Sequence, residues 1–317
     1  MSNFNQKAYN LAAKIDPHLT SPNPRVGCVI MKDNKIIAEG VHEKFGDSHA
    51  EQNAISTLPP SSSIYITLEP CGHFEGKKTP SCTELLIKNK PKKVYIGSLD
   101  PQFNGKNVEK LRSSGIEVEI LNDGFHEKLN PFFKKHISTK KPYITLKIAQ
   151  SLDGKITNTK KYITNKKSLE KVHQMRANYS AILTTTQTIL ADNPQLNVRL
   201  DTHTFSNPKI IIVGKTKIPK SLRIFQIPDR EIFQFTTFQE FWDSGLCQKI
   251  DSIMTECGSV LNSYLLKNNF VDEINLFIAP KIIGGNHLKS FNSEINLKKF
   301  SLKSTENLDG DVLLSFY

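Results

Sequence analysis

Two series of alternating strand-like and helix-like segments fill this chain of 317 residues. In the first series, the β-branched and aromatic run Ser63–Leu68 precedes a helical pattern at Ser81–Asn89. In the second series, the run Tyr143–Ala149 precedes a helical pattern at Lys166–Asn178. Strands separated by helices are typical of layered α/β domains. The alternation therefore predicts an α/β fold for both halves of the chain.

The length and one compositional break predict two domains. A chain of this size is long enough for two domains that each bury a core. Residues Lys134–Lys141 form a basic, polar stretch that separates the two series. We therefore expect one domain at residues 1–140 and a second at residues 142–317.

The composition is that of an ordinary globular protein, with 38% hydrophobic and 23% charged residues. No run of about 18 apolar residues occurs, so we expect no transmembrane helix. The polar N-terminus lacks the apolar core of a signal peptide. The five cysteines form no dense pattern, which is typical of a reducing compartment. We therefore expect a cytoplasmic protein that has no membrane partner.

The formal net charge of +11 raises the question of a nucleic-acid partner. Only six of the 42 basic residues are arginine, and the lysines are scattered along the whole chain. This distribution indicates a compositional bias rather than a nucleic-acid surface. It is also compatible with attraction of phosphorylated small molecules, and we expect such a molecule, not a nucleic acid, as the partner.

Three residues in the first half form a candidate metal site: His49, Cys71 and Cys82. One imidazole and two thiolates leave a tetrahedral Zn²⁺ one open position for water. Glu51 is not needed as a ligand and suits a proton carrier, because zinc lowers the pKa of its bound water. His-x-Glu followed by Pro-Cys-x-x-Cys is the signature of zinc deaminases, although here ten residues separate the cysteines. The choice of zinc also depends on geometry and metal availability.

The sequence around these residues resembles the deaminase half of the bifunctional riboflavin-biosynthesis deaminase/reductase family. The segments that carry the resemblance are 21–27 (SPNPRVG), 40–46 (GVHEKFG), 68–73 (LEPCGH) and 78–82 (KTPSC). The resemblance covers residues 1 to about 140 and implies a cytidine-deaminase-like three-layer domain. By resemblance, Asn23 would contact a pyrimidine, and four residues would lie at the ribose-phosphate end of the substrate: His42, His73, Lys78 and Thr79. Two features depart from the family pattern, a two-residue insertion that includes Glu75 and a serine at position 81 instead of proline.

The second half resembles the reductase half of the same family, which has a dihydrofolate-reductase-like fold. The segments that carry this resemblance are 143–154, 181–194, 196–199, 255–258 and 278–285, together with Arg176. A helix that opens at Gly258 would offer free backbone N–H groups to a cofactor phosphate. By resemblance, NADPH would contact Ala149, Tyr162, Thr188, Asp192 and Gly258. The phosphorylated substrate would contact Lys160, Arg176, Leu196, Arg199 and Glu256.

Asp192 and Lys147 are the titratable groups nearest the inferred hydride-transfer site, and are therefore the candidate proton carriers. Asp192 also suits a turn residue before Pro194. Three positions depart from the family pattern: Tyr162 replaces a tryptophan, Lys160 a serine and Ser259 a proline. An aromatic ring at 162 can still stack on a ligand, and the glycine at 258 is kept.

The sequence thus predicts a bifunctional enzyme of riboflavin synthesis that holds one zinc ion and uses NADPH. The deaminase would act on 2,5-diamino-6-ribosylamino-4(3H)-pyrimidinone 5′-phosphate, and the reductase would convert the ribosyl chain to ribityl. Three alternatives remain: a nucleic-acid (tRNA) editing deaminase, a deaminase with an inactive second domain, and a non-enzymatic zinc module. We also expect a homo-oligomer, either a dimer or a tetramer.

Overall fold

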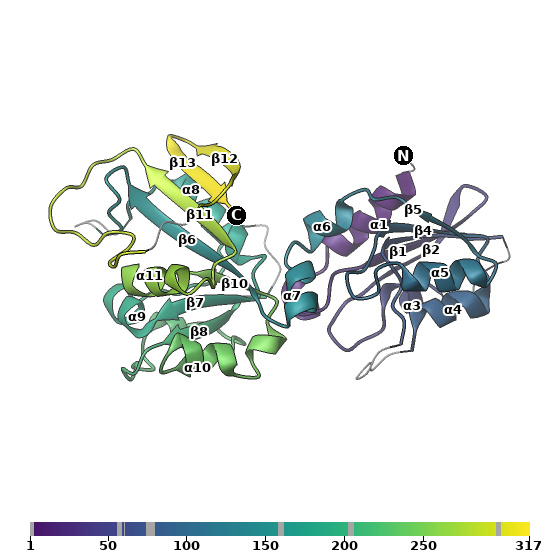
Figure 1. Cartoon of the computed structure of the whole chain (residues 1–317), viewed down its shortest axis with the longest axis horizontal. Helices are drawn as coiled ribbons and strands as arrows, with labels where there is room; N and C mark the ends of the chain where they lie inside the picture. Colours follow the sequence, from purple (N-terminus) through teal and green to yellow (C-terminus); the bar gives the residue numbers. More distant parts are fainter. Residues whose placement is uncertain are drawn as a thin grey trace. The chain divides into compact units, whose positions relative to one another are not determined.

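The structure is a computed structural model that describes residues 3–55, 59, 61–73, 80–157, 162–201, 206–295 and 299–317. It contains two compact units, Met1–Lys140 (unit 1) and Lys141–Tyr317 (unit 2) (Figure 1). Across the described residues, no helix has the length and apolar character needed to cross a membrane.

Unit 1 is built on a five-stranded sheet with the order β2-β1-β3-β4-β5. Its strands are β1 (Gly27–Lys32), β2 (Lys35–Val41), β3 (Ser63–Leu68), β4 (Lys93–Ser98) and β5 (Glu117–Ile120). Strands β1 and β2 form an antiparallel hairpin, in which Asp33 and Asn34 have positive φ. Strands β3, β4 and β5 run parallel to one another.

Helices cover both faces of this sheet, because alternate strand residues are apolar on each side. On one face of the sheet, Ala8 packs with Val29 and Tyr65. On the other face, Cys28 and Ile30 pack with buried helix residues such as Ala54, Leu86 and Leu111. The helices are α1 (Asn3–Ala13), α2 (Pro17–Thr20), α3 (Ala50–Ala54), α4 (Cys82–Asn89), α5 (Lys106–Ser113), α6 (Phe125–Leu129) and α7 (Phe133–Thr139). Helices α1 and α6 lie on one side and α3, α4 and α5 on the other, which gives three layers (Figure 1).

Unit 2 is built on an eight-stranded sheet with the order β12-β13-β11-β6-β10-β7-β8-β9. Its strands are β6 (Tyr143–Ser151), β7 (Ala181–Thr185), β8 (Lys209–Val213), β9 (Ile232–Phe235), β10 (Ser252–Thr255), β11 (Glu273–Ala279), β12 (Leu302–Leu308) and β13 (Asp311–Phe316). The six strands from β11 to β9 are parallel, whereas β13 and β12 are antiparallel additions.

The helices of unit 2 are α8 (Lys166–Arg176), α9 (Thr186–Asp192), α10 (Phe238–Asp243) and α11 (Ser259–Lys267). Helices α10 and α11 bury Phe241 and Leu265 against Ile144, Leu183 and Ile253 of the sheet. Helices α9 and α11 each begin where a parallel strand, β7 or β10, ends. The edge formed by the carboxyl ends of the strands is where ligands bind in open α/β sheets.

The elements differ from the predicted ones mainly where the sequence lacks a clear period. The stretch Lys134–Lys141, expected to separate the domains, is largely helix α7, and the two units divide at its end. Helices α6, α9 and α10 and strands β9 and β12 were not predicted. The sequence also favours a helix at Glu51–Leu58; the structure has α3 at Ala50–Ala54, and Ser56 to Leu58 lie outside the described residues.

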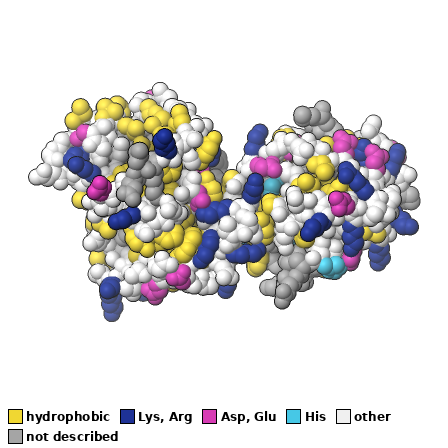
Figure 2. All heavy atoms as spheres, in the orientation of Figure 1, with side chains coloured by type: hydrophobic (Ala, Val, Ile, Leu, Met, Phe, Trp, Pro, Cys, Tyr) yellow, Lys and Arg dark blue, Asp and Glu magenta, His cyan; other side chains and the backbone are white. Residues whose placement is uncertain are grey.

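Basic side chains are distributed over the surface. Figure 2 shows Lys and Arg side chains on both units, with Asp and Glu side chains and uncharged atoms between them, on the face in view. Some lysines of the described residues are paired with carboxylates, as in Lys7 with Glu39 and Lys171 with Glu306. The high net charge is therefore partly balanced locally.

Candidate active sites

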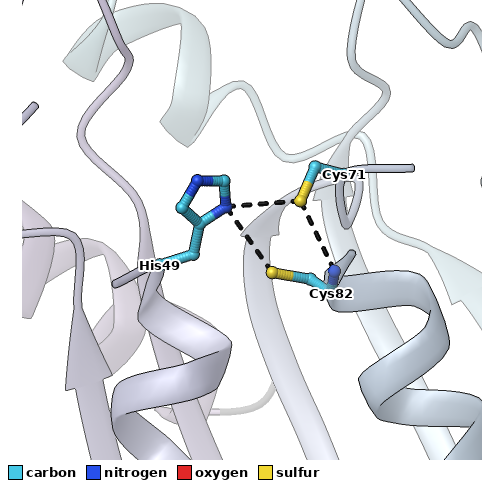
Figure 3. A group of neighbouring side chains, drawn as sticks. All are labelled: His49, Cys71 and Cys82. Carbon is cyan, nitrogen blue, oxygen red and sulfur yellow. Dashed lines mark hydrogen bonds between the residues drawn. The ribbon is translucent and has the colours of Figure 1, made fainter. Parts of the chain in front are cut away.

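The three predicted metal ligands converge in unit 1. His49 immediately precedes α3, Cys71 follows β3, and Cys82 is the first residue of α4. Their side chains point toward one another (Figure 3), and one ligand atom from each lies within 4.8 Å of the others. Two of the ligands therefore lie at helix starts, and the third follows the end of a strand.

The distances between these atoms fit a tetrahedral zinc ion. The Nδ1 atom of His49 lies 3.3 Å from Cys71 Sγ and 3.5 Å from Cys82 Sγ. Zinc–sulfur bonds of about 2.3 Å and zinc–nitrogen bonds of about 2.0 Å require a nitrogen–sulfur separation of about 3.5 Å in a tetrahedron. The imidazole and two thiolates can hold zinc with little movement and leave a fourth position for water.

Neighbouring groups hold the ligands in place. The Gln52 side chain accepts a hydrogen bond from the His49 backbone N–H at 3.0 Å. The Ser81 hydroxyl donates to the Cys71 carbonyl at 3.1 Å and caps α4 by accepting from the Glu84 N–H. The serine that replaces the family's proline thus ties the two cysteine segments together. Hydrogen bonding with Cys82, together with His49, lowers the pKa of the Cys71 thiol to about 3.

Helix α3 can approach β2 closely because residue 40 is glycine. A Cβ at Gly40 would lie 2.2 Å from the Ala50 carbonyl oxygen, so any larger residue would displace the helix start. This packing places Glu51 beside the metal ligands, with its side chain in contact with Cys82. Glu51 is only 4% exposed, and burial, followed by the Cys71 charge, raises its pKa to about 7.

Two of the predicted substrate residues lie next to the metal site. The Asn23 side-chain nitrogen is 3.4 Å from Nε2 of His42. The His42 ring in turn lies edge-on to His49, with the ring centroids 5.4 Å apart. His73 is exposed and pairs with Glu84 at 2.8 Å. Lys78 and Thr79, together with the inserted residues, lie outside the described residues.

In unit 2, the predicted cofactor residues gather at the carboxyl ends of three adjacent strands. Ala149 lies near the end of β6, Thr188 in the first turn of α9 after β7, and Gly258 directly before α11 after β10. Asp192 is exposed at the last residue of α9, about 6 Å further along the helix axis than Thr188. Tyr162 is 49% exposed, and Lys160 lies outside the described residues.

A buried ion pair organises the predicted substrate residues of unit 2. Nε of Arg176 lies 2.6 Å from Oε1 of Glu256, and Nη2 lies 2.8 Å from Oε2. Burial raises the pKa of Glu256, but the charge and hydrogen bonds of Arg176, together with the charges of Lys147 and His173, outweigh burial and hold this pKa below its usual value. Burial lowers the pKa of Lys147, although the nearby Glu256 carboxylate opposes this effect. Lys147, Arg176 and Glu256 therefore form one charged group.

The loop after α9 lies beside this charged group. Leu196 is buried with a positive φ of 50°, and the Arg199 side chain bonds to Asn197 Oδ1 at 2.6 Å. Two residues that the sequence analysis did not single out hold this loop. His173 Nδ1 accepts from the Arg199 backbone N–H at 3.2 Å, and Arg230 donates to the Gln195 carbonyl at 2.7 Å. His173 lies three residues before Arg176 and so on the same helix face, and this spacing could have identified it from the sequence. Nothing in the sequence indicates the role of Arg230.

A cavity of about 650 Å³ opens beside the start of α11. Its lining includes Ser259 of α11, the exposed Gly285, the basic side chains Lys155 and Lys289, and one acidic side chain, Glu294. Its size is within the range of small-molecule sites. The helix start and the basic residues would favour an anionic ligand.

Comparison with known protein families gives one match in unit 1 and one in unit 2. Residues 1–98 match the family model described as the cytidine and deoxycytidylate deaminase zinc-binding region. Residues 142–314 match the RibD C-terminal domain. The fold and the site thus define a zinc-binding deaminase domain joined to a reductase domain.

Relatives extend over nearly the whole chain. The riboflavin biosynthesis protein RibD of Actinobacillus pleuropneumoniae is 36% identical over 94% of this chain and 90% of its own length. The RibD of Aquifex aeolicus is 33% identical, with coverage of 99% and 97%. This chain belongs to the RibD family of riboflavin-biosynthesis proteins.

Solved structures have the same architecture. A structure of Acinetobacter baumannii RibD has a TM-score of 0.84 with 32% identity, and the match covers 99% of this chain and 97% of that one. A Thermotoga maritima diaminohydroxyphosphoribosylaminopyrimidine deaminase/5-amino-6-(5-phosphoribosylamino)uracil reductase has a TM-score of 0.82 with 33% identity, with coverage of 99% and 97%. The predicted fold class is confirmed, and so are zinc and NADPH as the cofactors of the two domains.

Proposed function

We propose that unit 1 deaminates 2,5-diamino-6-ribosylamino-4(3H)-pyrimidinone 5′-phosphate and that unit 2 reduces the ribosyl chain of the product to ribityl with NADPH. The observation that carries the proposal is the convergence of His49, Cys71 and Cys82 around one point, with the buried Glu51 beside them. Three protein ligands leave a position for water, whereas a structural zinc site normally has four.

In unit 1, the chain's own residues would orient the substrate and move protons. When bound, zinc supplies an acidic water molecule at neutral pH. Glu51 would take one proton from this water and give it to the ring nitrogen, then take the second from the hydroxyl added to the ring carbon and give it to the departing amine, which leaves as ammonia. Its burial beside Cys82 keeps the carboxyl group within reach of the site and away from bulk solvent.

The substrate would enter between the metal site and the loop that carries Asn23. The Asn23 amide, which lies against His42, offers both a donor and an acceptor to the pyrimidine edge. His42 and His73 would contact the ribose-phosphate end. Lys78 and Thr79 are proposed for the same end of the substrate from the family resemblance alone.

In unit 2, hydride from NADPH would add to the anomeric carbon as the carbon–oxygen bond of the sugar ring breaks, and the released ring oxygen would take up a proton. Lys147 and Asp192 are the proposed proton carriers. Ala149, Tyr162, Thr188, Asp192 and Gly258 would hold NADPH, and the cavity beside α11, which is lined by Lys155 and Lys289 as well as Glu294, supports an anionic cofactor there. The substrate phosphate and ribose would contact Lys160, Arg176, Leu196, Arg199 and Glu256.

Supplying each domain with its own substrate tests this division. We expect Glu51→Gln to lower deamination by about 10²- to 10⁴-fold while NADPH oxidation with the deaminated substrate stays at the wild-type rate. Lys147→Met should show the opposite pattern. If either variant affected both reactions equally while the protein stayed folded, the assignment of one reaction to each unit would be wrong.

The proposal also covers location and assembly. All five cysteines lie within the described residues and no disulfide joins them, which supports a cytoplasmic location.

Strand β12 is exposed along nearly its whole length at one edge of its sheet, and such an edge can pair with a second copy. We therefore propose a homo-oligomer, a dimer or a tetramer. Light scattering after size exclusion would measure its mass, and a monomer at micromolar concentration would overturn this part.

A further inference from the structure

The loop that carries Asn23 reaches the metal site but has little regular structure of its own. It runs from Ser21 to Arg25, between α2 and β1, and two of its five residues are prolines. The Asn23 amide is 3.4 Å from His42, and His42 lies against the metal ligand His49. The position of this backbone therefore determines where the Asn23 amide points relative to the metal.

One side chain from a distant part of unit 1 holds this backbone. The Arg25 N–H donates to Oδ1 of Asn130 at 2.8 Å, and Nδ2 of Asn130 donates to the Arg25 carbonyl at 3.0 Å. The Arg25 guanidinium also donates to the Leu129 carbonyl. The amide of Asn130 thus pairs with the loop as a neighbouring strand would, by one donor and one acceptor.

Asn130 is itself fixed on every side. Its backbone N–H donates to the His126 carbonyl at 2.8 Å, and its carbonyl accepts from the Phe133 N–H at 3.2 Å. Its Nδ2 also lies 3.2 Å from Nδ1 of His126. Burial lowers the pKa of His126 to about 4, so the ring is neutral at pH 7 and Nδ1 can accept. This contact sets the orientation of the amide, with Oδ1 toward the Arg25 N–H.

We propose that Asn130 is a positioning residue for deamination, which clamps the Ser21–Arg25 loop so that Asn23 meets the pyrimidine. Asn130 directly follows α6, so this helix would support the deaminase site. The inference rests on the proposed function of unit 1. A displacement of about 1 Å in a substrate-positioning group can cost on the order of 10² in rate.

The test uses the full-length zinc-loaded protein and three variants: Asn130→Ala, Asn130→Asp and Asn89→Ala. Asn130→Ala removes both bonds to Arg25. Asn130→Asp keeps the shape but loses the donor and places a charged oxygen against the Arg25 carbonyl. Asn89→Ala is the control, because the Asn89 amide also bonds to a backbone carbonyl, that of Leu85, at the far end of α4.

We expect both Asn130 variants to raise the KM for deamination by about 10-fold or more, with a smaller change in kcat. Zinc content, and reduction of the deaminated substrate by unit 2 of the same chain, should stay at wild-type values. Asn89→Ala should match the wild type. If Asn130→Asp behaved like the wild type, Asn130 would only fill space, and the proposal would be overturned. Zinc loss in parallel with activity would also overturn it, since it would indicate collapse of unit 1.

Hydrogen exchange gives a readout that does not depend on activity. The Arg25 amide should be protected in the wild type and exchange faster in Asn130→Ala. If the wild type failed to deaminate its substrate, the proposed function would fail, yet this measurement would still test the clamp. An unprotected Arg25 amide in the wild type would contradict the proposal that Asn130 holds this loop.

Discussion

Arg176 and Glu256 form a two-bond ion pair between α8 and the end of β10, with nitrogen–oxygen distances of 2.6 and 2.8 Å. Both side chains are nearly buried, at 10% and 12% exposure. Arg176 also donates to the Asn197 carbonyl at 3.0 Å. The pair therefore connects a helix, a strand end and the loop that carries Arg199.

Removing one partner of this pair should destabilise unit 2. Arg176→Ala leaves the Glu256 charge buried and unpaired, which costs about 3–5 kcal/mol. The single tryptophan of the chain, Trp242, packs against Phe238 and Phe270 in unit 2, so its fluorescence in urea reports the unfolding of that unit. The exposed Arg223→Ala is the control, and equal losses in the two variants would contradict the argument.

Acid should destabilise unit 2 through His173. Burial, followed by the charges of Arg176 and Arg199, lowers its pKa to about 4. The unfolded chain therefore binds the proton more tightly, so stability is full above about pH 6.5 and about 3 kcal/mol is lost as pH falls to 4. The urea midpoint from Trp242 fluorescence should fall over this range, and less so in His173→Gln. Identical slopes in the wild type and this variant would refute the assignment.

Asp153 should matter for the binding of NADPH. Its carboxylate accepts from the Ile283 and Gly284 N–H groups at 3.1 and 2.7 Å, which joins the loop after β6 to the loop after β11. Both loops leave the sheet at the edge proposed for the cofactor. We expect Asp153→Ala to raise the KM for NADPH by about 10-fold.

Asp272→Ala is the control for this prediction. Asp272 also accepts from a backbone N–H, that of Ile144 at 2.7 Å, but at the opposite end of β6. Its loss should leave the KM for NADPH unchanged. A similar rise in both variants would indicate a general loss of structure.

Ser81 should control how firmly the metal is held. Its hydroxyl joins the Cys71 and α4 segments, and loss of such a supporting contact typically weakens metal binding by about 10- to 100-fold. Ser81→Ala should therefore release zinc to a chelator at lower chelator concentration, as followed with a zinc-sensitive dye. Ser113→Ala removes an exposed hydroxyl that bonds only within α5, and should behave like the wild type.

Much of the fold and the metal site could be predicted from local pattern. Runs such as Ser63–Leu68 carry a strong strand signal because both faces of the strand are covered. The helical pattern at Ser81–Asn89 placed Cys82 correctly at a helix start. Contacts between distant segments were not accessible in this way. Nothing in the sequence near Asn130 indicates that its amide holds Arg25, which lies 105 residues away.

The missed elements have physical explanations. Helix α9 (TQTILAD) is rich in threonine, a residue that favours strands, and it forms where Thr185 caps the helix by accepting from the Thr188 N–H. Strand β12 (LKSTENL) is exposed on both faces and so shows no alternation. Helix α7 was treated as a polar linker, because only Phe133 and His136 of its residues are buried.

The most direct test of the account is mass spectrometry of the diaminopyrimidine ribotide incubated with the purified protein, with and without NADPH. Without NADPH, we predict a gain of about one mass unit as an amine becomes a carbonyl. With NADPH, we predict a further gain of about two units from one hydride and one proton. No change in mass with zinc bound would contradict the proposed substrate, and a gain of one unit only, with NADPH present, would show that unit 2 is not the proposed reductase.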